Sequence, residues 1–334
     1  MKKTLSLLTA FLLLLSFASC VSPAADDSAS PSPTLNENRP VMNVAALKGP
    51  TAMGMIGLMR DDEDNTSAVD YEFTVSGAVD EIGPLLIQGK ADVASVPANL
   101  AAVLYANTDG QLAVLAVNTL GVLYMMETGD AVQTFADLKG KTIYLSGKGA
   151  VPEYSLLHLL KQNGLDPASD VTLEFKSEHT EVVAALATDP DGVGLLPEPF
   201  ITTASQQNDA LRVCLDLTAE WDAVSTDSAM ITGVVVARRA YLDANPDAVN
   251  TFLDEYAASV AFVNTDIPES ASLIEKYGIF PAAVAEKAIP ACNIVCIAGD
   301  EMQTMLEGYL TVLHEQKPEA VGGALPDEAF YYKP

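Results

Sequence analysis

The sequence predicts an α/β fold in which mainly parallel β-sheets are covered by helices. Short apolar runs at Val41 to Leu47, Tyr71 to Ser76 and Asp92 to Val96 each lead through a glycine or proline corner into a stretch with helical spacing. Such alternation is typical of parallel sheets, because each strand returns through a helix before the next begins.

Two clusters of this alternation divide the chain into two lobes. Leu112 to Met126 is an apolar run long enough for a strand that leaves one lobe for the other, and Met230 to Ala237 is expected to be a buried strand. We therefore predict a discontinuous lobe 1 from residues 41–118 and 231–334, and a lobe 2 from residues 119–230.

The first 20 residues have the pattern of an export signal. Lys2 and Lys3 precede an apolar stretch from Leu5 to Phe17, and Ala18-Ser19 stands directly before Cys20. The apolar stretch is too short, and too close to a small-residue cleavage site, for a membrane-spanning helix. Residues 1–20 are expected to be a lipoprotein signal peptide with Cys20 as the lipidated residue. The alternative is an ordinary secretory signal, and both alternatives predict export.

Residues 21–40 are expected to be a disordered linker. They are rich in Ser, Pro, Asp and Asn and show no apolar periodicity. Such a segment cannot bury enough surface to offset the entropy lost on ordering. The sequence thus predicts a folded part held outside the cytoplasmic membrane by a lipid anchor.

Charge and composition limit the possible partners. The formal net charge is −27, and 49% of the residues are apolar, which is enough for a substantial core. Basic residues are scattered singly, whereas phosphate backbones require a basic face, so we expect no nucleic-acid partner. Acidity of this size indicates solubility and does not identify a ligand.

Cysteine and histidine positions predict neither a metal site nor a cofactor. Cys292 and Cys296 are four residues apart on an expected strand, so their thiols should lie far apart, and Cys214 has no evident partner. A disulfide stays an alternative to the favoured role as apolar filling. The histidines lie in no recognised metal-ligand spacing; they are His158, His179 and His314.

Two glycine corners are candidate binding loops, because ligands of open α/β sheets gather beyond the carboxyl ends of the strands. In Gly49-Pro50-Thr51, the amides of Thr51, Ala52 and Met53 would point out of a helix start and attract a carboxylate, sulfonate or carbonyl group. Gly147-Lys148-Gly149 lacks the remaining residues of a P-loop or dinucleotide fingerprint, but could form a cradle of backbone amides. The alternative for each corner is an ordinary turn.

Glu198 is the most informative carboxylate. It stands between Pro197 and Pro199 directly after an expected strand, and the prolines should hold its side chain in one direction. It could accept hydrogen bonds from an amine or ring nitrogen of a ligand, the alternative being a solvated corner. No Gly-x-Ser-x-Gly, HExxH or Cys-His motif is present, so we do not expect an enzyme.

Together these segments resemble a lipoprotein that binds substrate for an ABC transporter. The resemblance rests on the signal ending at Cys20, Val44-Ala-Ala-Leu-Lys-Gly-Pro-Thr-Ala-Met-Gly-Met55, Asp92-Val-Ala-Ser-Val-Pro-Ala-Asn99, Asp137-Leu-Lys-Gly-Lys-Thr142 and Pro197-Glu-Pro199. It covers nearly the whole mature chain. The most similar branch contains binders of taurine, alkanesulfonates and thiamine precursors.

The resemblance implies a type II periplasmic-binding fold, with a ligand cleft between two lobes that closes on binding. By position, it places Gly49 to Met53, Ser76-Gly77, Pro97 to Asn99, Gly147 to Gly149 and Glu198 in the cleft, and Asn118-Thr119 and Ile231 to Gly233 beside the hinges. It further implies a monomer that delivers a small organic ligand, of sulfonate, pyrimidine or thiamine-precursor type, to an ABC permease. The cysteine-rich motif of thiamine-precursor enzymes is missing.

Two other functions remain as alternatives. A sensory or structural lipoprotein would have a small, dry cleft and a large exposed apolar patch. An exported enzyme would have turnover and a cleft carboxylate with a strongly shifted pKa.

Overall fold

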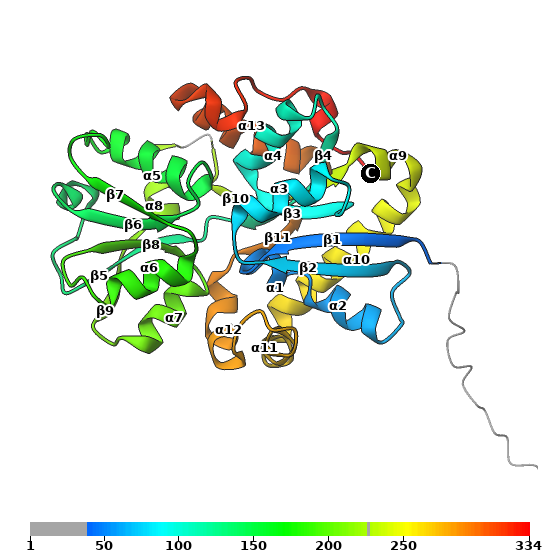
Figure 1. Cartoon of the computed structure of the whole chain (residues 1–334), viewed down its shortest axis with the longest axis horizontal. Coiled ribbons are helices and arrows are strands. Elements are labelled where there is room, and N and C mark those ends of the chain that lie inside the picture. The colour runs from blue at the N-terminus through cyan, green and yellow to red at the C-terminus, as the bar shows by residue number, and fades with distance from the viewer. Residues whose placement is uncertain (1–38, 226–227) are drawn as a thin grey trace, which may run out of the picture. The chain divides into compact units, whose positions relative to one another are not determined.

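The computed structural model describes residues 39–225 and 228–334, and its strands form two separate sheets (Figure 1). The first sheet has the order β11-β4-β10-β3-β1-β2, and the second has the order β7-β6-β8-β5-β9. The strands of the first sheet are β1 (Val41–Leu47), β2 (Asp70–Ser76), β3 (Val93–Pro97), β4 (Leu112–Leu120), β10 (Ile231–Arg238) and β11 (Ile294–Ile297). Those of the second are β5 (Leu123–Thr128), β6 (Thr142–Ser146), β7 (Thr172–Lys176), β8 (Val193–Pro197) and β9 (Leu211–Asp216).

The predicted α/β class with two sheets is confirmed, but the sheets are mixed rather than mainly parallel. β1 pairs in parallel with β2 and β3, and β6 with β7 and β8. β10 is antiparallel to β3 and β4, and β5 is antiparallel to β8 and β9. The antiparallel pairs arise where the chain crosses between the sheets: β4 and β5 carry it from the first sheet to the second, and β10 brings it back.

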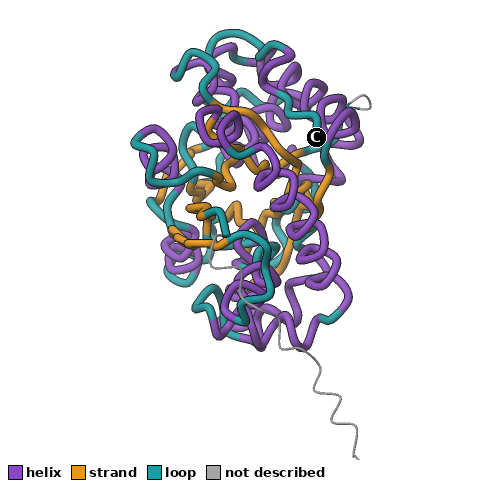
Figure 2. Tube along the Cα trace, turned by 90° about the vertical axis from the view of Figure 1, so that its right-hand side faces the viewer, coloured by secondary structure: helices purple, strands orange, loops and turns teal. Residues whose placement is uncertain are grey.

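Helices surround the strands, as the tube view shows (Figure 2). Between the strands of the first sheet lie α1 (Pro50–Met53), α2 (Ile56–Glu63), α3 (Val79–Ile87) and α4 (Ala98–Asn107). Between those of the second lie η1 (Phe135–Leu138), α5 (Val151–Gln162), α6 (His179–Leu186) and α7 (Phe200–Gln207). Next come α8 (Leu217–Val224), then α9 (Arg239–Ala244), α10 (Pro246–Thr265), α11 (Ile267–Lys276), α12 (Ala282–Ala288), η2 (Ile289–Ala291), α13 (Gly299–Gln316), η3 (Pro318–Val321) and η4 (Glu328–Phe330).

Alternating apolar residues place two buried clusters on opposite faces of the sheets. Val44 of β1 belongs to one cluster and its neighbour Ala45 to the other, because successive strand residues point to opposite faces. The first cluster includes Met53, Phe252 and Tyr256, and the second includes Phe135, Trp221 and Tyr309. We call each sheet, together with the helices that cover it, one half of the molecule. Both clusters take residues from both sheets, so the two halves share their apolar packing.

The described chain begins at Arg39, inside the predicted linker. The Arg39 guanidinium donates to Ser67 Oγ at 2.8 Å and to Asp70 Oδ1 at 3.2 Å, and the carbonyl of Pro40 accepts from the amide of Asp70 at 3.0 Å. These bonds hold the chain just before β1, and the boundary of the predicted linker stays a prediction. The predicted signal peptide and residues 21–38 lie outside the described residues. The lobe boundaries stay a prediction.

Candidate functional site

A cavity of about 680 Å³ lies between the two halves of the chain. The first half contributes Gly77, the start of α3, and Leu100 and Leu104 of α4. The second half contributes the segments Ser146–Ala150 and Lys176–His179, at the ends of β6 and β7. Strand ends and helix starts thus form its wall, which is the ordinary location of ligands in open α/β sheets. The volume lies within the usual range of small-molecule sites.

The cavity contains four of the predicted site residues, namely Gly77, Gly147, Lys148 and Gly149. It brings the second glycine corner together with the loop after β2, although 70 residues of chain separate them. The other candidates are Gly49 to Met53, Ser76, Pro97, Asn99 and Glu198, and none of them is part of this cavity's lining. Their assignment to a ligand site stays a prediction.

The loop Gly147-Lys148-Gly149 owes its path to two left-handed glycines. Gly147 has φ +77° and Gly149 has φ +75°, a region that side chains with a Cβ rarely adopt. The amide of Gly149 does not point to an empty cradle: it donates to Glu153 Oε2 at 2.6 Å. The Lys148 ammonium lies 5.4 Å from the centre of the Phe175 ring. One amide of the predicted cradle is therefore already bound by a carboxylate of the same chain.

A serine and a histidine that the sequence did not single out as site residues meet in the cavity wall. Ser146 Oγ and His179 Nδ1 are 2.7 Å apart, and the His179 ring lies 4.8 Å from the Phe200 ring. Burial lowers the pKa of His179 to about 4, so the ring is neutral at pH 7. Ser146 could have been found because it ends β6 immediately before the glycine corner. No sequence motif marks His179 as a site residue.

Glu178 reaches across the cavity from the residue before α6. A Cβ added to Gly77 would lie 3.1 Å from Glu178 Oε1, so this carboxylate lies against the loop after β2 of the other half. Both residues line the cavity. The lack of a side chain at Gly77 therefore gives the carboxylate its space.

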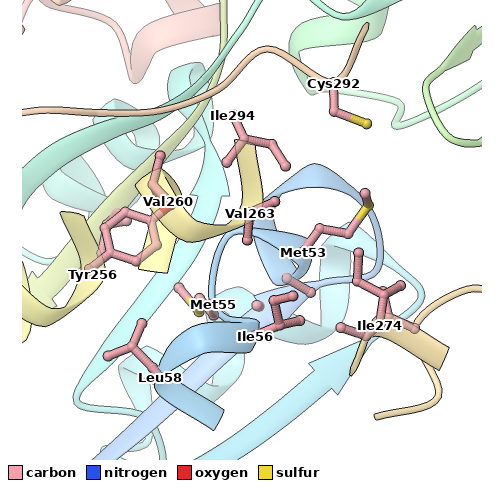
Figure 3. Close-up of a cluster of buried hydrophobic side chains, with 14 of the residues drawn as sticks. Met53, Met55, Ile56, Leu58, Tyr256, Val260, Val263, Ile274, Cys292 and Ile294 are labelled. Carbon is pink, nitrogen blue, oxygen red and sulfur yellow. The ribbon is translucent and has the colours of Figure 1, made fainter. Parts of the chain in front are cut away.

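At the corner from Gly49 to Met53, the structure contradicts the prediction that the amides of Ala52 and Met53 point out of the helix start. The amides of Ala52 and Met53 donate to the carbonyl of Gly49, at 3.1 and 3.0 Å, so they are not free for a ligand. The Met53 side chain is fully buried among Ile56, Val263, Ile274 and other apolar residues (Figure 3). Gly49 is the N-cap residue of α1, and its carbonyl accepts these two amides as the first hydrogen bonds of the helix.

Thr51, Ser76 and Pro97 are also withdrawn from solvent. Thr51 is 8% exposed, and its hydroxyl donates to the carbonyl of Leu47 at 2.7 Å. The carbonyl of Ser76 accepts from the amide of Lys48 at 2.8 Å. Pro97 ends β3 opposite Gly233 of β10. These residues support the strand ends, and none of these contacts points to a ligand.

Asn99 links the two halves. Its amide nitrogen donates to the carbonyls of Gly149, at 3.0 Å, and Ala320, at 3.1 Å. The side chain is fully buried, and its oxygen has no donor among the described residues. A buried acceptor without a donor costs free energy, and this oxygen lies outside the lining of the cavity.

Glu198 is a buried carboxylate without a cationic partner among the described residues. It is 7% exposed and accepts from the amide and the hydroxyl of Thr202, each at 3.1 Å. Burial raises its pKa, and these two hydrogen bonds act in the opposite direction. Burial is the main cause that raises the pKa values of Tyr124 and Cys292, and the charge of Glu198 adds to both shifts. The solvated-corner alternative is wrong, because the side chain is held inside the protein.

The predicted hinge residues lie where the chain crosses between the sheets. Asn118 Nδ2 donates to Ser95 Oγ at 3.0 Å, and the oxygens of Asn118 and Thr119 have no partner within the described chain. A Cβ on Gly233 would lie 2.5 Å from Asn118 Oδ1, so a larger residue at that position of β10 would displace the Asn118 side chain. Their role as hinges stays a prediction.

Within the described residues, the structure also bears on the predictions about cysteines, metal ions and membrane-spanning helices. Cys214, Cys292 and Cys296 are free, so the disulfide alternative is wrong, and Cys292 is fully buried. Among residues 39–225 and 228–334, no group of three metal-ligating side chains occurs. Nor does any helix within these ranges have the length and apolarity needed to cross a membrane.

Comparison with known proteins places the chain in a family. The family described as "ABC transporter, phosphonate, periplasmic substrate-binding protein" matches residues 63–284, about two-thirds of the chain. The chain therefore belongs to this family of periplasmic substrate-binding proteins. It follows that the protein is the substrate-binding component of an ABC import system for small ligands. No curated protein matches the sequence.

Solved structures show the same fold at low sequence identity. An ABC transporter protein from Parabacteroides distasonis has a TM-score of 0.73 and 24% identity, over 88% of this chain and 99% of that one. The aliphatic sulphonate-binding protein SsuA of Escherichia coli has a TM-score of 0.70 and 18% identity, over 86% and 96%. SsuA of Xanthomonas axonopodis pv. citri, bound to MOPS, has a TM-score of 0.68 and 17% identity, over 88% and 97%. The type II periplasmic-binding fold is thereby confirmed.

Proposed function

We propose that this protein is a lipid-anchored receptor outside the cytoplasmic membrane, which binds a small organic ligand between its two lobes and delivers it to an ABC permease. The observation that carries the proposal is the cavity of about 680 Å³, whose wall is built by both halves of the chain. A ligand that touches both halves favours their closed arrangement by its difference in affinity for the open and closed states. No covalent step is required.

The contacts across the cavity are suited to such closure. Asn99 of the first half donates to Gly149 of the second, and Glu178 of the second lies against Gly77 of the first. On another side, Gln206 Nε2 donates to the carbonyl of Ala283 at 3.3 Å. Each of these is a single polar contact, and the halves are also joined by apolar packing, which includes the rings of Phe200 and Phe280 at 5.1 Å.

The ligand class is open to several chemistries. The family is described by phosphonate, and two of the similar structures are named for sulphonates. The resemblance of the sequence adds pyrimidines and thiamine precursors. Glu198 would accept hydrogen bonds from an amine or ring nitrogen of the ligand, since its buried carboxylate has no cationic partner among the described residues.

Lipidation at Cys20 would hold the receptor close to its permease and raise its effective concentration there. Cys20→Ser tests this part by itself. Wild-type protein labelled in cells with radioactive palmitate should carry the label and remain with the membrane fraction. The variant should lose both. Release of the wild-type protein into the medium without label would contradict the anchor.

Differential scanning fluorimetry tests ligand binding. We expect one member of a panel of alkanesulfonates, phosphonates, amines, pyrimidines and thiamine precursors to raise the melting temperature in a saturable manner. At about 100 times its dissociation constant, a ligand should add about 2.7 kcal/mol to the free energy of unfolding. Gly77→Leu, which fills the space beside Glu178, should abolish the shift. Glu301→Gln, on an exposed position of α13, is the matched control.

Two outcomes separate the alternatives. Recovery of the ligand unchanged supports a receptor, whereas its conversion to a product would favour an exported enzyme, for which the raised pKa of Glu198 is the supporting observation. Silence across the panel would favour a sensory or structural lipoprotein. Against that alternative stand the size of the cavity and the scattered positions of the exposed apolar side chains, which include Val41, Ile87, Val213 and Leu325.

A further inference from the structure

Asn99 joins three segments that are far apart in the sequence. It is the second residue of α4 in the first half, and it is fully buried. Its amide nitrogen donates to the carbonyl of Gly149 in the second half, at 3.0 Å, and to the carbonyl of Ala320 near the C-terminus, at 3.1 Å. Among the described residues, it makes the only hydrogen bond from the first half to residues 146–150 of the cavity wall. Asn99 therefore holds a loop that lines the cavity without lining it itself.

Helix α4 and the C-terminal segment are packed tightly together. The hydroxyl of Tyr105 donates to Asp327 Oδ1 at 2.6 Å, and a Cβ added to Gly322 would lie 2.7 Å from the Cβ of Ala106. These contacts all lie within the first half. Of the two hydrogen bonds of Asn99, the one to the C-terminal segment therefore stays inside the first half, and only the other crosses between the halves.

The glycine loop is held on its other side by its own half. The amide of Gly149 donates to Glu153 Oε2 at 2.6 Å, and the Lys148 ammonium lies 5.4 Å from the centre of the Phe175 ring. Nothing lies within 4 Å of a Cβ added to Gly149, so the space around this residue is open. The position of the loop relative to the first half thus depends on the hydrogen bond from Asn99.

The Asn99 amide is only half satisfied in this arrangement. Its nitrogen faces two carbonyl oxygens, which fixes the orientation of the amide, because the reverse would place oxygen against oxygen. Its oxygen is buried and has no donor within the described chain. The hydrogen bonds of the nitrogen are favourable, whereas the unpaired acceptor is unfavourable by a similar amount. The contact therefore defines the geometry of the closed arrangement without making that arrangement strongly stable.

We propose that Asn99 is a positioning residue, which fixes where the glycine loop stands when the two halves close and leaves the choice between open and closed to the ligand. The inference rests on the proposed receptor function and adds how its cavity is assembled. Because the contact itself is nearly balanced, a ligand between the halves shifts the equilibrium by its own difference in affinity for the two states. A residue outside the lining thereby controls the shape of the cavity.

Hydrogen–deuterium exchange of the purified protein, followed by mass spectrometry and without any ligand, tests this role. Asn99→Asp replaces the donor by a carboxylate that faces two carbonyl oxygens, so the loop should separate from α4. At pH 7.5 the peptide that covers residues 146–150 should exchange about tenfold faster than in the wild type, which corresponds to about one net hydrogen bond. Strand β8, in the middle of the second sheet, should keep its wild-type protection.

A change of pH separates positioning from a general loss of packing. Burial raises the pKa of a carboxyl group, and a protonated carboxyl has one O–H donor. At pH 5.0, Asn99→Asp should therefore recover most of the wild-type protection. The titratable groups beside the loop are Glu153, His179 and Lys148, and they are the same in both proteins, so the difference at each pH belongs to residue 99. Asn107→Asp makes the same change at the exposed end of α4 and should match the wild type at both pH values.

Asn99→Ser is the second variant, and it carries the test if Asn99→Asp does not fold. It removes both donations without adding a charge, so the loop should exchange faster at both pH values. Wild-type exchange of the loop in these variants would overturn the proposal. Equal acceleration in the loop and in β8, or failure of both variants to fold, would also overturn it, because Asn99 would then only hold the fold together. Since no ligand is added, the receptor function is tested separately by the fluorimetry panel.

Discussion

The two glycine corners have the same position between a strand and a helix, but only one of them reaches the cavity. Gly49-Pro50-Thr51 and Gly147-Lys148-Gly149 each come after a strand and precede a helix. The first is buried and bonded to itself, and the second lines the cavity between the halves. Their side chains explain the difference, because Met53 enters the core, whereas Lys148 stays exposed. A strand–glycine–helix pattern thus locates a corner, and the side chains around it decide whether a ligand can reach it.

The largest effect should come from Met53 in the buried corner. Met53→Ala removes a fully buried side chain and leaves a cavity, so the free energy of unfolding should fall by about 3 kcal/mol. Urea unfolding followed by circular dichroism measures it. Lys148→Ala in the exposed corner is the matched change and should cost less than about 0.5 kcal/mol. Similar losses at both positions would remove the distinction between the corners.

A second effect should depend on pH at the exposed corner. The pKa of His179 in the folded state, about 4, lies below its ordinary value of 6.5, so protonation disfavours folding. The contribution of the neutral ring is complete above pH 6.5 and is lost as the pH falls toward 4. Between pH 7.5 and 4.5 the wild type should therefore lose about 2 kcal/mol more stability than His179→Gln. Parallel pH profiles of the two proteins would contradict this.

A third comparison separates the two glycines of the exposed corner. Gly147→Ala and Gly149→Ala both place alanine at positive φ, which costs about 1 kcal/mol. At Gly147 the added Cβ would also lie 3.3 Å from Pro152 Cγ, whereas at Gly149 nothing lies within 4 Å. The first variant should therefore lose about 0.5 kcal/mol more than the second. Equal midpoints of urea unfolding would show that Pro152 yields without cost.

The smallest effect should come from Glu153. Glu153→Gln weakens the hydrogen bond to the amide of Gly149 and removes a negative charge from the start of α5, so stability should fall by about 0.5 to 1 kcal/mol. High salt should reduce the difference from wild type, since it screens the charge. A variant more stable than wild type would mean that repulsion from the other carboxylates of the cavity outweighs the cap.

Local patterns in the sequence predicted the strands well. Val41–Leu47 is a strand with the expected bounds, because its apolar run is bounded by a glycine-proline corner. The apolar run from Leu112 to Met126 was expected as one strand and is divided between β4 and β5. Gly121 lies at the division, where an added Cβ would collide with Thr218 Oγ1. The need for glycine at this point comes from a residue almost 100 positions away, and no local pattern contains that contact.

The site was predicted in part for the same reason. Gly77 and the loop at Gly147 reach the cavity because the carboxyl ends of strands meet there, which sequence order can indicate. Glu178 and His179 were missed, because their importance comes from Gly77 and Ser146, which lie elsewhere in the chain. The prediction of free amides at Ala52 and Met53 was wrong, because α1 begins at Pro50 and the carbonyl of Gly49 accepts both amides.

The segment at Tyr331 and Tyr332 contacts the first sheet, so that sheet depends on residues that are synthesised late. Tyr331 forms a bridge with Val114 of β4, and the amide of Tyr332 donates to the carbonyl of Val114 at 2.9 Å. All five strands of the second sheet come from one uninterrupted segment, 123–216. During synthesis the second sheet can therefore form while the first still lacks β10, β11 and this last bridge. The sheet that holds the N-terminal strand thus depends on residues more than 250 positions later in the chain, whereas the second sheet is complete at residue 216.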